Sequence, residues 1–376
     1  MQLLRPWDLE LPESARRLRA EVREFLRAAL ADGRFVPRCD AWLEGHDLGF
    51  SKLLGERGWL GLSWPSRFGG GDRSPLDRYV VVEELLAAGA PVAAHWMAER
   101  QVGPSLLRHG NDEQRQRFLP AIARGECFFS IGLSEPDSGS DLASVTTAAR
   151  PVEGGWRVTG RKLWTSHAHR SQYLLTLCRT TPGASRHEGL SQLIVDLHAP
   201  GVSVRPVETM TGEAHFCEVT LDDAFVPDAD VLGALGAGWR QVMSELAFER
   251  SGPERFLSTF PLLDRLASRV GDDRRKVEAL GMLVADLQVL RRLSLSVAAQ
   301  TTAEEAPGVA AAVVKDLGTQ FEREIVEAAR LWIGNDPDAQ LTRLYHEAVL
   351  AAPSFSLRGG STEIMRGLVA QAVRAG

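Results

Sequence analysis

The sequence predicts a mixed α+β protein in which an antiparallel β-domain lies between two helical domains. Three observations lead to this prediction. Apolar residues recur at helical spacing over residues 12–124, short alternating runs fill residues 127–232, and long helical periodicity returns from residue 236 onward. We therefore expect three domains, which comprise residues 1–125, 126–232 and 233–376.

The N-terminal domain opens with an amphipathic stripe. Its apolar side chains recur at helical spacing: Leu18, Val22, Phe25, Leu26 and Leu30. Glycines and prolines between residues 58 and 71 divide later helical pieces. Asn111–Gln114 offers a cap for a helix that ends near Pro120. These signals predict an all-helical domain.

The middle domain contains short runs bounded by Gly, Pro and Asp, a pattern typical of β-strands. The clearest runs are Gly155–Thr159, Tyr173–Leu177, Leu193–Leu197 and Val202–Val207. No helical crossovers separate them in the sequence, which favours antiparallel pairing over βαβ units. The sequence also lacks a Gly-x-Gly-x-x-Gly motif after a strand, so a Rossmann dinucleotide site is disfavoured.

The C-terminal domain has long segments with helical periodicity. They are Trp239–Leu246, Val277–Val297, Val309–Leu331 and Ile364–Val373. Helices this long and apolar pack as a bundle.

Composition narrows the classes of function. The formal net charge is −6 and the arginines are scattered, which disfavours a nucleic-acid surface. Four cysteines lie far apart without a Cys-x-x-Cys pair, which disfavours a disulfide framework or a zinc site. No targeting or membrane segment is evident, since the first residues are interrupted by charge and proline. We expect a cytoplasmic protein with no membrane partner.

Two stretches suggest a ligand site. The loop Ile131–Asp141 is rich in Ser, Gly, Pro and Asp, which turn the chain and expose backbone N–H groups. After a hairpin signal at Glu153–Trp156, the segment Lys162–Ser166 brings Trp164 between two hydroxyl residues, where it could stack on a flat ring. The alternative interpretation is that Ser134 and Ser140 cap turns and that Trp164 fills a core.

At this spacing the two stretches together resemble the flavin-binding signature of the acyl-CoA dehydrogenase family. Further segments resemble that family in the same order: Gly58–Pro65, His109–Gln114, Phe216–Pro227 and Arg358–Ile364. The resemblance covers nearly the whole chain. It implies an N-terminal helical domain, a middle β-barrel-like domain and a C-terminal four-helix bundle, with FAD as cofactor.

The resemblance also implies residues that contact the cofactor. On the middle domain these are Leu133, Ser134, Gly139, Ser140, Trp164 and Ser166. Ser361, Thr362 and Glu363 of the C-terminal motif would then lie near the cofactor as well.

The catalytic base is the informative position. Many members of the family carry a glutamate immediately before the Gly-Thr or Gly-Ser of the C-terminal motif, and that position is Gly359 here. Isovaleryl-CoA and long-chain dehydrogenases carry their base on an earlier helix, in a Glu-Arg pair that Glu249 and Arg250 resemble. Pro253 clashes with the carbonyl four residues earlier, so we expect the helix to kink or open at Glu249. The alternative is a solvated Glu-Arg pair.

Two properties of this site follow from general chemistry. A base that faces a dry acyl pocket has its pKa raised by desolvation, and Arg250 would oppose that shift if it lay close. A backbone N–H does not depend on the side chain, so the Gly359 amide can still donate to the thioester oxygen, as the resemblance implies.

Some family features are missing. The regions of the family's Arg-x-x-Phe-Gly and Gly-Gly-x-Gly motifs are Arg269–Arg275 and Ala329–Asp336, and neither matches. FAD is therefore held differently, shared with a non-identical partner subunit, or bound weakly. We interpret His167 and His169 as loop polarity rather than metal ligands. The sequence has no Gly-x-Ser-x-Gly elbow of a serine hydrolase.

We therefore predict an FAD-dependent dehydrogenase that oxidises an acyl thioester, bound to CoA or to a carrier protein, to the trans-2-enoyl thioester. The resemblance implies an electron-transferring flavoprotein as electron acceptor, and an oligomer: a homodimer, a homotetramer or a heterotetramer with a related subunit. Two alternatives remain open. One is a flavin oxidase or monooxygenase on the same fold, and the other is a non-catalytic partner subunit. The sequence does not indicate acyl chain length or branching.

Overall fold

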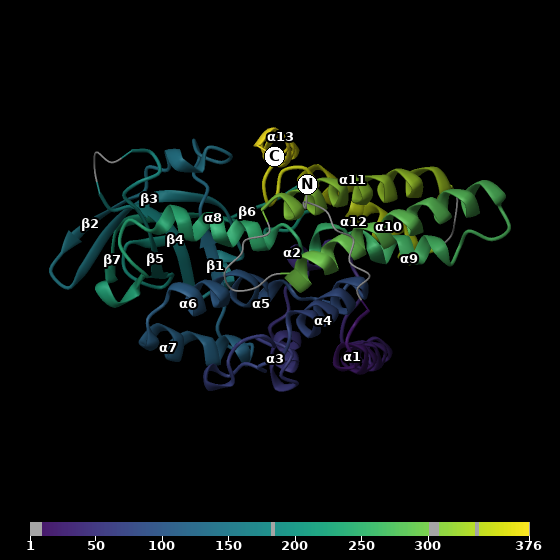
Figure 1. Cartoon of the computed structure of the whole chain (residues 1–376), viewed down its shortest axis with the longest axis horizontal. Coiled ribbons are helices and arrows are strands. Elements are labelled where there is room, and N and C mark those ends of the chain that lie inside the picture. The colour runs from purple at the N-terminus through teal and green to yellow at the C-terminus, as the bar shows by residue number, and fades with distance from the viewer. Residues whose placement is uncertain (1–9, 182–184, 301–307, 335–337, 376) are drawn as a thin grey trace. The chain divides into compact units, whose positions relative to one another are not determined.

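The computed structural model describes residues 10–181, 185–300, 308–334 and 338–375. The chain forms two compact units (Figure 1). The helical unit comprises Met1–His46, Arg73–Val92 and Leu246–Gly376, and the sheet unit comprises Asp47–Asp72 and Ala93–Glu245.

The described residues of the sheet unit form one eight-stranded sheet. Its strands are β1 (Phe129–Gly132), β2 (Ala148–Val152), β3 (Gly155–Ser166), β4 (Tyr173–Arg179), β5 (Leu190–Asp196), β6 (Val202–Val207), β7 (Phe216–Pro227) and β8 (Val231–Leu232). The spatial order is β6-β7-β3-β2-β4-β5-β8, and β1 pairs with β4. All four strand runs expected from the sequence are present.

Most of the strand pairs are antiparallel, as predicted. The β2–β3 hairpin turns at Glu153–Gly154, where Val152 pairs with Gly155. Strand β1 differs, because it pairs in parallel with β4, and Ala148 of β2 also bridges β4 in parallel. A four-residue strand carries too little pattern to reveal its pairing direction. Between the parallel strands β1 and β4 the chain runs through the β2–β3 hairpin, where a crossover helix is more usual.

Short helices accompany this sheet: α3 (Leu48–Glu56), α5 (Ala93–Met97), a π-helical turn (Ala98–Val102), α6 (Gly103–His109) and α7 (Asp112–Ala123). The π-helical turn, α6 and α7 share a buried core with the sheet, formed by residues such as Trp64, Phe118, Phe129 and Leu175. The Asn111–Gln114 capping box is confirmed. The helix continues three residues beyond Pro120, which lies in its last turn.

The described helices of the helical unit are α1 (Glu13–Ala31), α2 (Ala41–Glu44), α4 (Pro75–Ala87), α9 (Phe260–Ala267), α10 (Arg274–Gln300), α11 (Gly308–Trp332), α12 (Ala339–Phe355) and α13 (Thr362–Ala375), with a 3-10 turn, η6 (Pro253–Arg255). The predicted α1 stripe is confirmed by the burial of Leu18, Val22 and Leu26. Helices α9, α10, α12 and α13 pack around α11 (Figure 1).

Buried ion pairs join the N-terminal helices to this bundle. Arg19 of α1 contacts Glu83 of α4 at 2.5 Å, and Arg291 of α10 contacts the same carboxylate at 2.6 Å. The helices expected to form one N-terminal domain are thus divided, with α1, α2 and α4 in the helical unit and α3 and α5–α7 in the sheet unit. The three-domain division of the sequence stays a prediction.

Helix α8 (Gly238–Glu249) begins in the sheet unit, and its last four residues belong to the helical unit. In the sheet unit, Ser105 of α6 donates to Glu245 of α8 at 2.7 Å. The side chains of residues 246–249 lie outside the described part of the structure.

Candidate active site

The loop after β1 folds around a buried ion pair in the sheet unit. Lys162 Nζ of β3 donates to Glu135 Oε1 at 2.9 Å and to the Leu133 carbonyl at 3.2 Å. Glu135 also accepts from the backbone N–H groups of Thr146 and Thr147, at 2.7 and 2.9 Å. Burial by itself would raise the pKa of Glu135, but the Lys162 ammonium and these hydrogen bonds outweigh burial and lower that pKa to about 2.

Further hydrogen bonds fix the backbone of this loop. Leu163 N–H donates to the Ser134 carbonyl at 2.9 Å, which ties the loop to β3. Ser138 Oγ donates to the Asp141 carbonyl at 2.8 Å, so Ser138 closes the turn, a role that the sequence suggested for its neighbours. The predicted cofactor residues of this unit are all half-buried or exposed: Leu133, Ser134, Gly139, Ser140, Trp164 and Ser166.

Trp164 does not fill a core. Its side chain is 55% exposed, and it lies edge-to-face with Phe216 at 5.7 Å between ring centroids. Its φ of +59° is a conformation that a bulky residue adopts only when its surroundings enforce it. The next residue, Thr165, is buried, and within the described residues its hydroxyl has no hydrogen-bond partner. An exposed, fixed indole is suited to stack against a flat ring.

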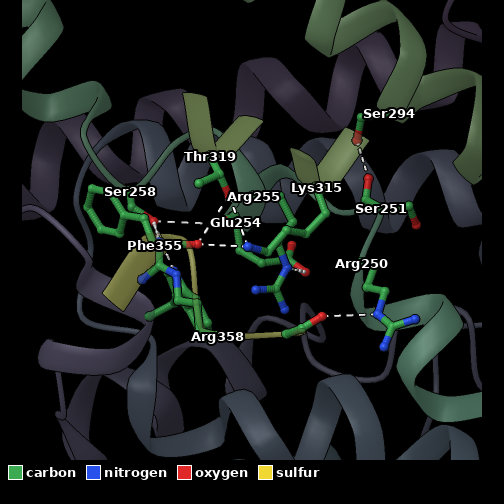
Figure 2. Close-up of polar contacts among 12 residues, drawn as sticks. Arg250, Ser251, Glu254, Arg255, Ser258, Ser294, Lys315, Thr319, Phe355 and Arg358 are labelled. Carbon is green, nitrogen blue, oxygen red and sulfur yellow. Dashed lines mark hydrogen bonds and ion pairs between the residues drawn. The ribbon is translucent and has the colours of Figure 1, made fainter. Parts of the chain in front are cut away.

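In the helical unit the structure brings Arg250 and Gly359 together. Arg250 Nε donates to the Gly359 carbonyl at 3.0 Å, across 109 residues of sequence (Figure 2). Within the described part of the chain, the Gly359 N–H donates to no protein acceptor. This N–H is therefore available to a ligand. The carbonyl and N–H of Gly359 thus have separate roles.

Backbone geometry explains why position 359 is glycine. Gly359 and Gly360 have φ values of +68° and +101°. A Cβ at position 359 would lie 2.8 Å from Nη1 of Arg255, whose side chain is almost fully buried. One at position 360 would lie 2.7 Å from the Met365 methyl group. A glutamate at 359 would therefore be strained and would collide with a guanidinium.

Glu249 is the last residue of α8, so the helix ends where Pro253 predicts that it should open. The side chain of Glu249 lies outside the described residues, and its role as base stays a prediction. After the turn at Arg250, Ser294 Oγ of α10 donates to the Ser251 carbonyl at 2.5 Å (Figure 2). The segment that follows Glu249 is thus fixed to the bundle.

Ser361 and Glu363 lie at the start of α13. Ser361 Oγ accepts from the Ile364 N–H at 3.4 Å, as a helix cap does. The N–H of Glu363 itself and the Ser361 hydroxyl lower the pKa of the exposed Glu363 carboxyl. Both residues have local roles, and their predicted contacts with a cofactor stay untested. The second departing motif segment, Ala329–Asp336, ends in residues outside the described ranges.

A buried polar network that the sequence did not predict surrounds Arg358, the residue before Gly359. The guanidinium of Arg358 contacts Asp40, Ser258 Oγ at 2.6 Å and Glu322 at 3.2 Å. The Ser258 N–H donates to Glu322 at 2.9 Å. Glu322, an isolated charge inside the apolar stripe of α11, was the signal that could have indicated this network, since charges are rarely buried unless paired. Lys162 is likewise an isolated charge, on the strand β3.

A cluster of histidines adjoins β7 in the sheet unit. His169 Nδ1 lies 3.0 Å from Cys217 Sγ, and the His167 and His169 rings are 6.5 Å apart. Among the described residues no group of three or more His, Cys, Asp or Glu is placed to hold a metal ion.

Comparison with known proteins identifies the class. Three family models match consecutive parts of the chain: the N-terminal, middle and C-terminal domains of acyl-CoA dehydrogenase, over residues 12–126, 130–224 and 264–374. The acyl-CoA dehydrogenase IpdE1 of Mycobacterium tuberculosis is 37% identical over 337 residues, which cover 86% of each protein. The chain belongs to the acyl-CoA dehydrogenase family. It is an acyl-CoA dehydrogenase enzyme, in the class of flavoprotein oxidoreductases.

Other acyl-CoA dehydrogenases extend this result. FadE34 of M. tuberculosis is 36% identical over 281 residues, which cover 73% of this chain but 39% of the longer FadE34. Among solved structures, the Tcur3481-Tcur3483 steroid ACAD has a TM-score of 0.86 at 28% identity and covers 98% of this chain and 99% of its own. The ChsE4-ChsE5 complex from M. tuberculosis has a TM-score of 0.81 at 28% identity, over 98% of this chain and 99% of that one. The predicted family and fold class are confirmed.

Acyl-CoA dehydrogenases typically use FAD, and the sheet unit fits such a group. Its accessible hydroxyls, the unsatisfied Thr165 hydroxyl and the exposed Trp164 indole form a donor set suited to a flat heteroaromatic ring. No helix among the described residues is long and apolar enough to cross a membrane.

Proposed function

We propose that this protein is an FAD-dependent enzyme that converts an acyl-CoA to the trans-2-enoyl thioester, with Glu249 as base. One observation carries the proposal: the Arg250 hydrogen bond to Gly359. It joins the residue that follows Glu249 to the glycine that stands where other family members carry their base. Glu249 on the earlier helix and the Gly359 N–H, which binds the thioester carbonyl, would then act on the same substrate α-carbon.

Glu249 takes the α-proton in this mechanism. The α-proton of a thioester is weakly acidic, so abstraction requires a carboxylate close to it and a donor on the carbonyl oxygen. The Gly359 N–H is that donor. Arg250 holds the Gly359 carbonyl, which belongs to the peptide unit that follows the N–H, so it restrains the residue on its C-terminal side before substrate binds. Restraint of a donor before the reaction is the condition for stabilising developing negative charge.

FAD would lie against Leu133, Ser134, Ser140, Trp164 and Ser166, and when bound it supplies the acceptor for the hydride of the β-carbon. Trp164 would orient the ring by stacking, and the serine residues would supply hydrogen bonds. The Lys162–Glu135 pair holds the loop in place beneath them. Electrons would leave to an electron-transferring flavoprotein.

We infer a bulky, ring-bearing acyl group as the substrate class. The support is the name of a structure that is similar over nearly the whole chain, a steroid ACAD. A carrier-protein thioester is the other form of substrate. Four free, buried cysteines support a location in the reducing cytoplasm.

The test is reduction of the flavin under anaerobic conditions. Purified protein, loaded with FAD, is mixed with CoA thioesters of straight, branched and ring-bearing acids, and bleaching of the visible band is followed. Glu249→Gln should lose about 10² to 10⁴ in rate. Glu324→Gln changes an exposed carboxyl on α11 and should behave as the wild type. Near-normal turnover of Glu249→Gln would remove Glu249 as base.

A partner subunit of a heteromeric dehydrogenase is the second candidate. Three features favour this candidate. The Arg255 guanidinium occupies the space that a side chain at position 359 would need, the FAD motifs are missing, and the chain is similar to a two-protein complex. A colourless protein that takes up no FAD and co-purifies with a second dehydrogenase chain would support it. Rapid oxygen consumption would instead indicate the oxidase or monooxygenase.

A further inference from the structure

The helical unit buries a lysine that the proposed mechanism does not use. The chain contains four lysines among 43 basic residues, so a lysine at a given position is unusual. Lys315 of α11 is only 1% exposed. Because burial of an ammonium group is costly, its retention requires an explanation.

Lys315 holds the end of the helix that leads to Gly359. Its Nζ donates to the Phe355 carbonyl at 2.7 Å and to Thr319 Oγ1 at 3.0 Å (Figure 2). The Thr319 hydroxyl donates to the same carbonyl at 3.1 Å. Phe355 is the last residue of α12, and the last carbonyls of a helix have no partner within the helix. Gly359 follows four residues later.

The segment after Phe355 has a second anchor. The Arg358 guanidinium contacts Asp40, Ser258 and Glu322, and it stacks over the Phe355 ring at 4.6 Å. The connection between the Phe355 carbonyl and the Gly359 peptide is therefore short and held at both ends. A shift at the Phe355 carbonyl would be transmitted to the Gly359 N–H.

We propose that Lys315 is a positioning residue, which fixes the turn that presents the Gly359 N–H to the thioester carbonyl. This inference rests on the proposed function, in which that N–H is used. Lys315 acts through the Phe355 carbonyl and does not itself touch the substrate.

The charges around Lys315 agree with a functional rather than a stabilising role. Burial, together with the charges of Arg255 of η6 and Arg358 after α12, lowers the pKa of Lys315 to about 7, against the opposing effect of Glu322 and Asp316 of α11. Among the described residues no carboxylate lies within ion-pair distance of Lys315 Nζ. A perturbed, unpaired charge beside a candidate site is more typical of function than of stability.

The experiment compares Lys315→Met with a matched control, Lys276→Met. Lys276 Nζ donates to the Trp332 carbonyl at 3.2 Å, at the C-terminal end of α11, so it makes the same type of bond away from Gly359. Two readouts are followed in each variant: amide hydrogen exchange of the peptide that covers residues 354–361, and kcat and KM for flavin reduction by an acyl-CoA.

Lys315→Met is expected to exchange faster in this peptide and to lower kcat about 10- to 100-fold, with KM within a fewfold of wild type, since small misplacements of a catalytic group have effects of this size. Lys276→Met should match the wild type in both readouts. Unchanged exchange in Lys315→Met, or faster exchange with unchanged kcat, would overturn the inference. If no acyl thioester reduces the flavin of the wild-type protein, the proposed function is refuted instead.

Lys315→Gln is the second variant, for the case in which the methionine variant does not fold. Glutamine keeps an N–H donor but is shorter and uncharged. It should give intermediate exchange and an intermediate kcat. A glutamine variant that equals the wild type in both exchange and kcat would overturn the role of Lys315.

Discussion

In each unit a buried lysine donates a hydrogen bond to a backbone carbonyl, but the charges near the two lysines differ. In the sheet unit, Lys162 donates to the Leu133 carbonyl and has a carboxylate partner, Glu135, at 2.9 Å. In the helical unit, Lys315 donates to the Phe355 carbonyl, and the like charges of Arg255 and Arg358 act on it more strongly than the carboxylates of Glu322 and Asp316. Each lysine supports a backbone segment of its own unit.

This difference determines how each interaction depends on pH. The Glu135 carboxylate that pairs with Lys162 stays charged over the whole physiological range, since the pKa of Glu135 is about 2. Lys315, with a pKa of about 7, changes charge near neutral pH. We therefore expect the sheet-unit loop to be insensitive to pH and the Gly359 turn to respond to it.

Breaking the Lys162 pair should have the largest effect. Glu135→Gln leaves a buried ammonium without its counter-charge and should cost about 3 to 5 kcal/mol of unfolding free energy at pH 7. The folded pKa of Glu135 lies below its ordinary value, so the carboxylate's contribution is complete above that value and is lost as pH falls toward 2. Urea denaturation at pH 7 and pH 3 measures this.

Its control is Glu153→Gln, which changes an exposed carboxyl in the β2–β3 turn. That variant should be within about 0.5 kcal/mol of wild type at both pH values. A Glu135→Gln variant that is as stable as Glu153→Gln at pH 7 would contradict the assignment of the ion pair.

Adding a methyl group at Gly359 should have the next largest effect. Gly271 has a φ of +59° with open space around it, so Gly271→Ala measures backbone strain alone, about 1 to 2 kcal/mol. Gly359→Ala adds a contact with the buried Arg255 and should cost more, with a loss of kcat that Gly271→Ala does not show. Equal stabilities of the two variants would mean that Arg255 yields without cost.

The most gradual effect, measured per pH unit, is the pH response of Lys315. Because its folded pKa lies below its ordinary value of 10.5, the unfolded chain binds more protons between pH 7 and about 10.5. Wild-type stability should therefore rise with pH relative to Lys315→Met, by at most about 1.4 kcal/mol per pH unit. Parallel curves for the two proteins from pH 7 to 10, in urea denaturation, would show that Lys315 does not titrate there.

Family and fold class followed from the sequence because they depend on local patterns. The stripe around Leu18, the β2–β3 hairpin turn and the Asn111 cap are set by residues a few positions apart. The loop signature likewise placed Ser134, Ser140 and Trp164 on accessible positions. The role of Glu249 stays a prediction, as do the cofactor contacts.

The sequence by itself determined the class of this protein and the positions at which its site is built, because periodicity and turn chemistry act over short distances. Only the tertiary structure decided how those positions are supported. Lys315 meets Phe355 across 40 residues and Arg250 meets Gly359 across 109, and no local pattern encodes such pairs. Long-range packing also placed the Arg255 guanidinium where a side chain at position 359 would lie.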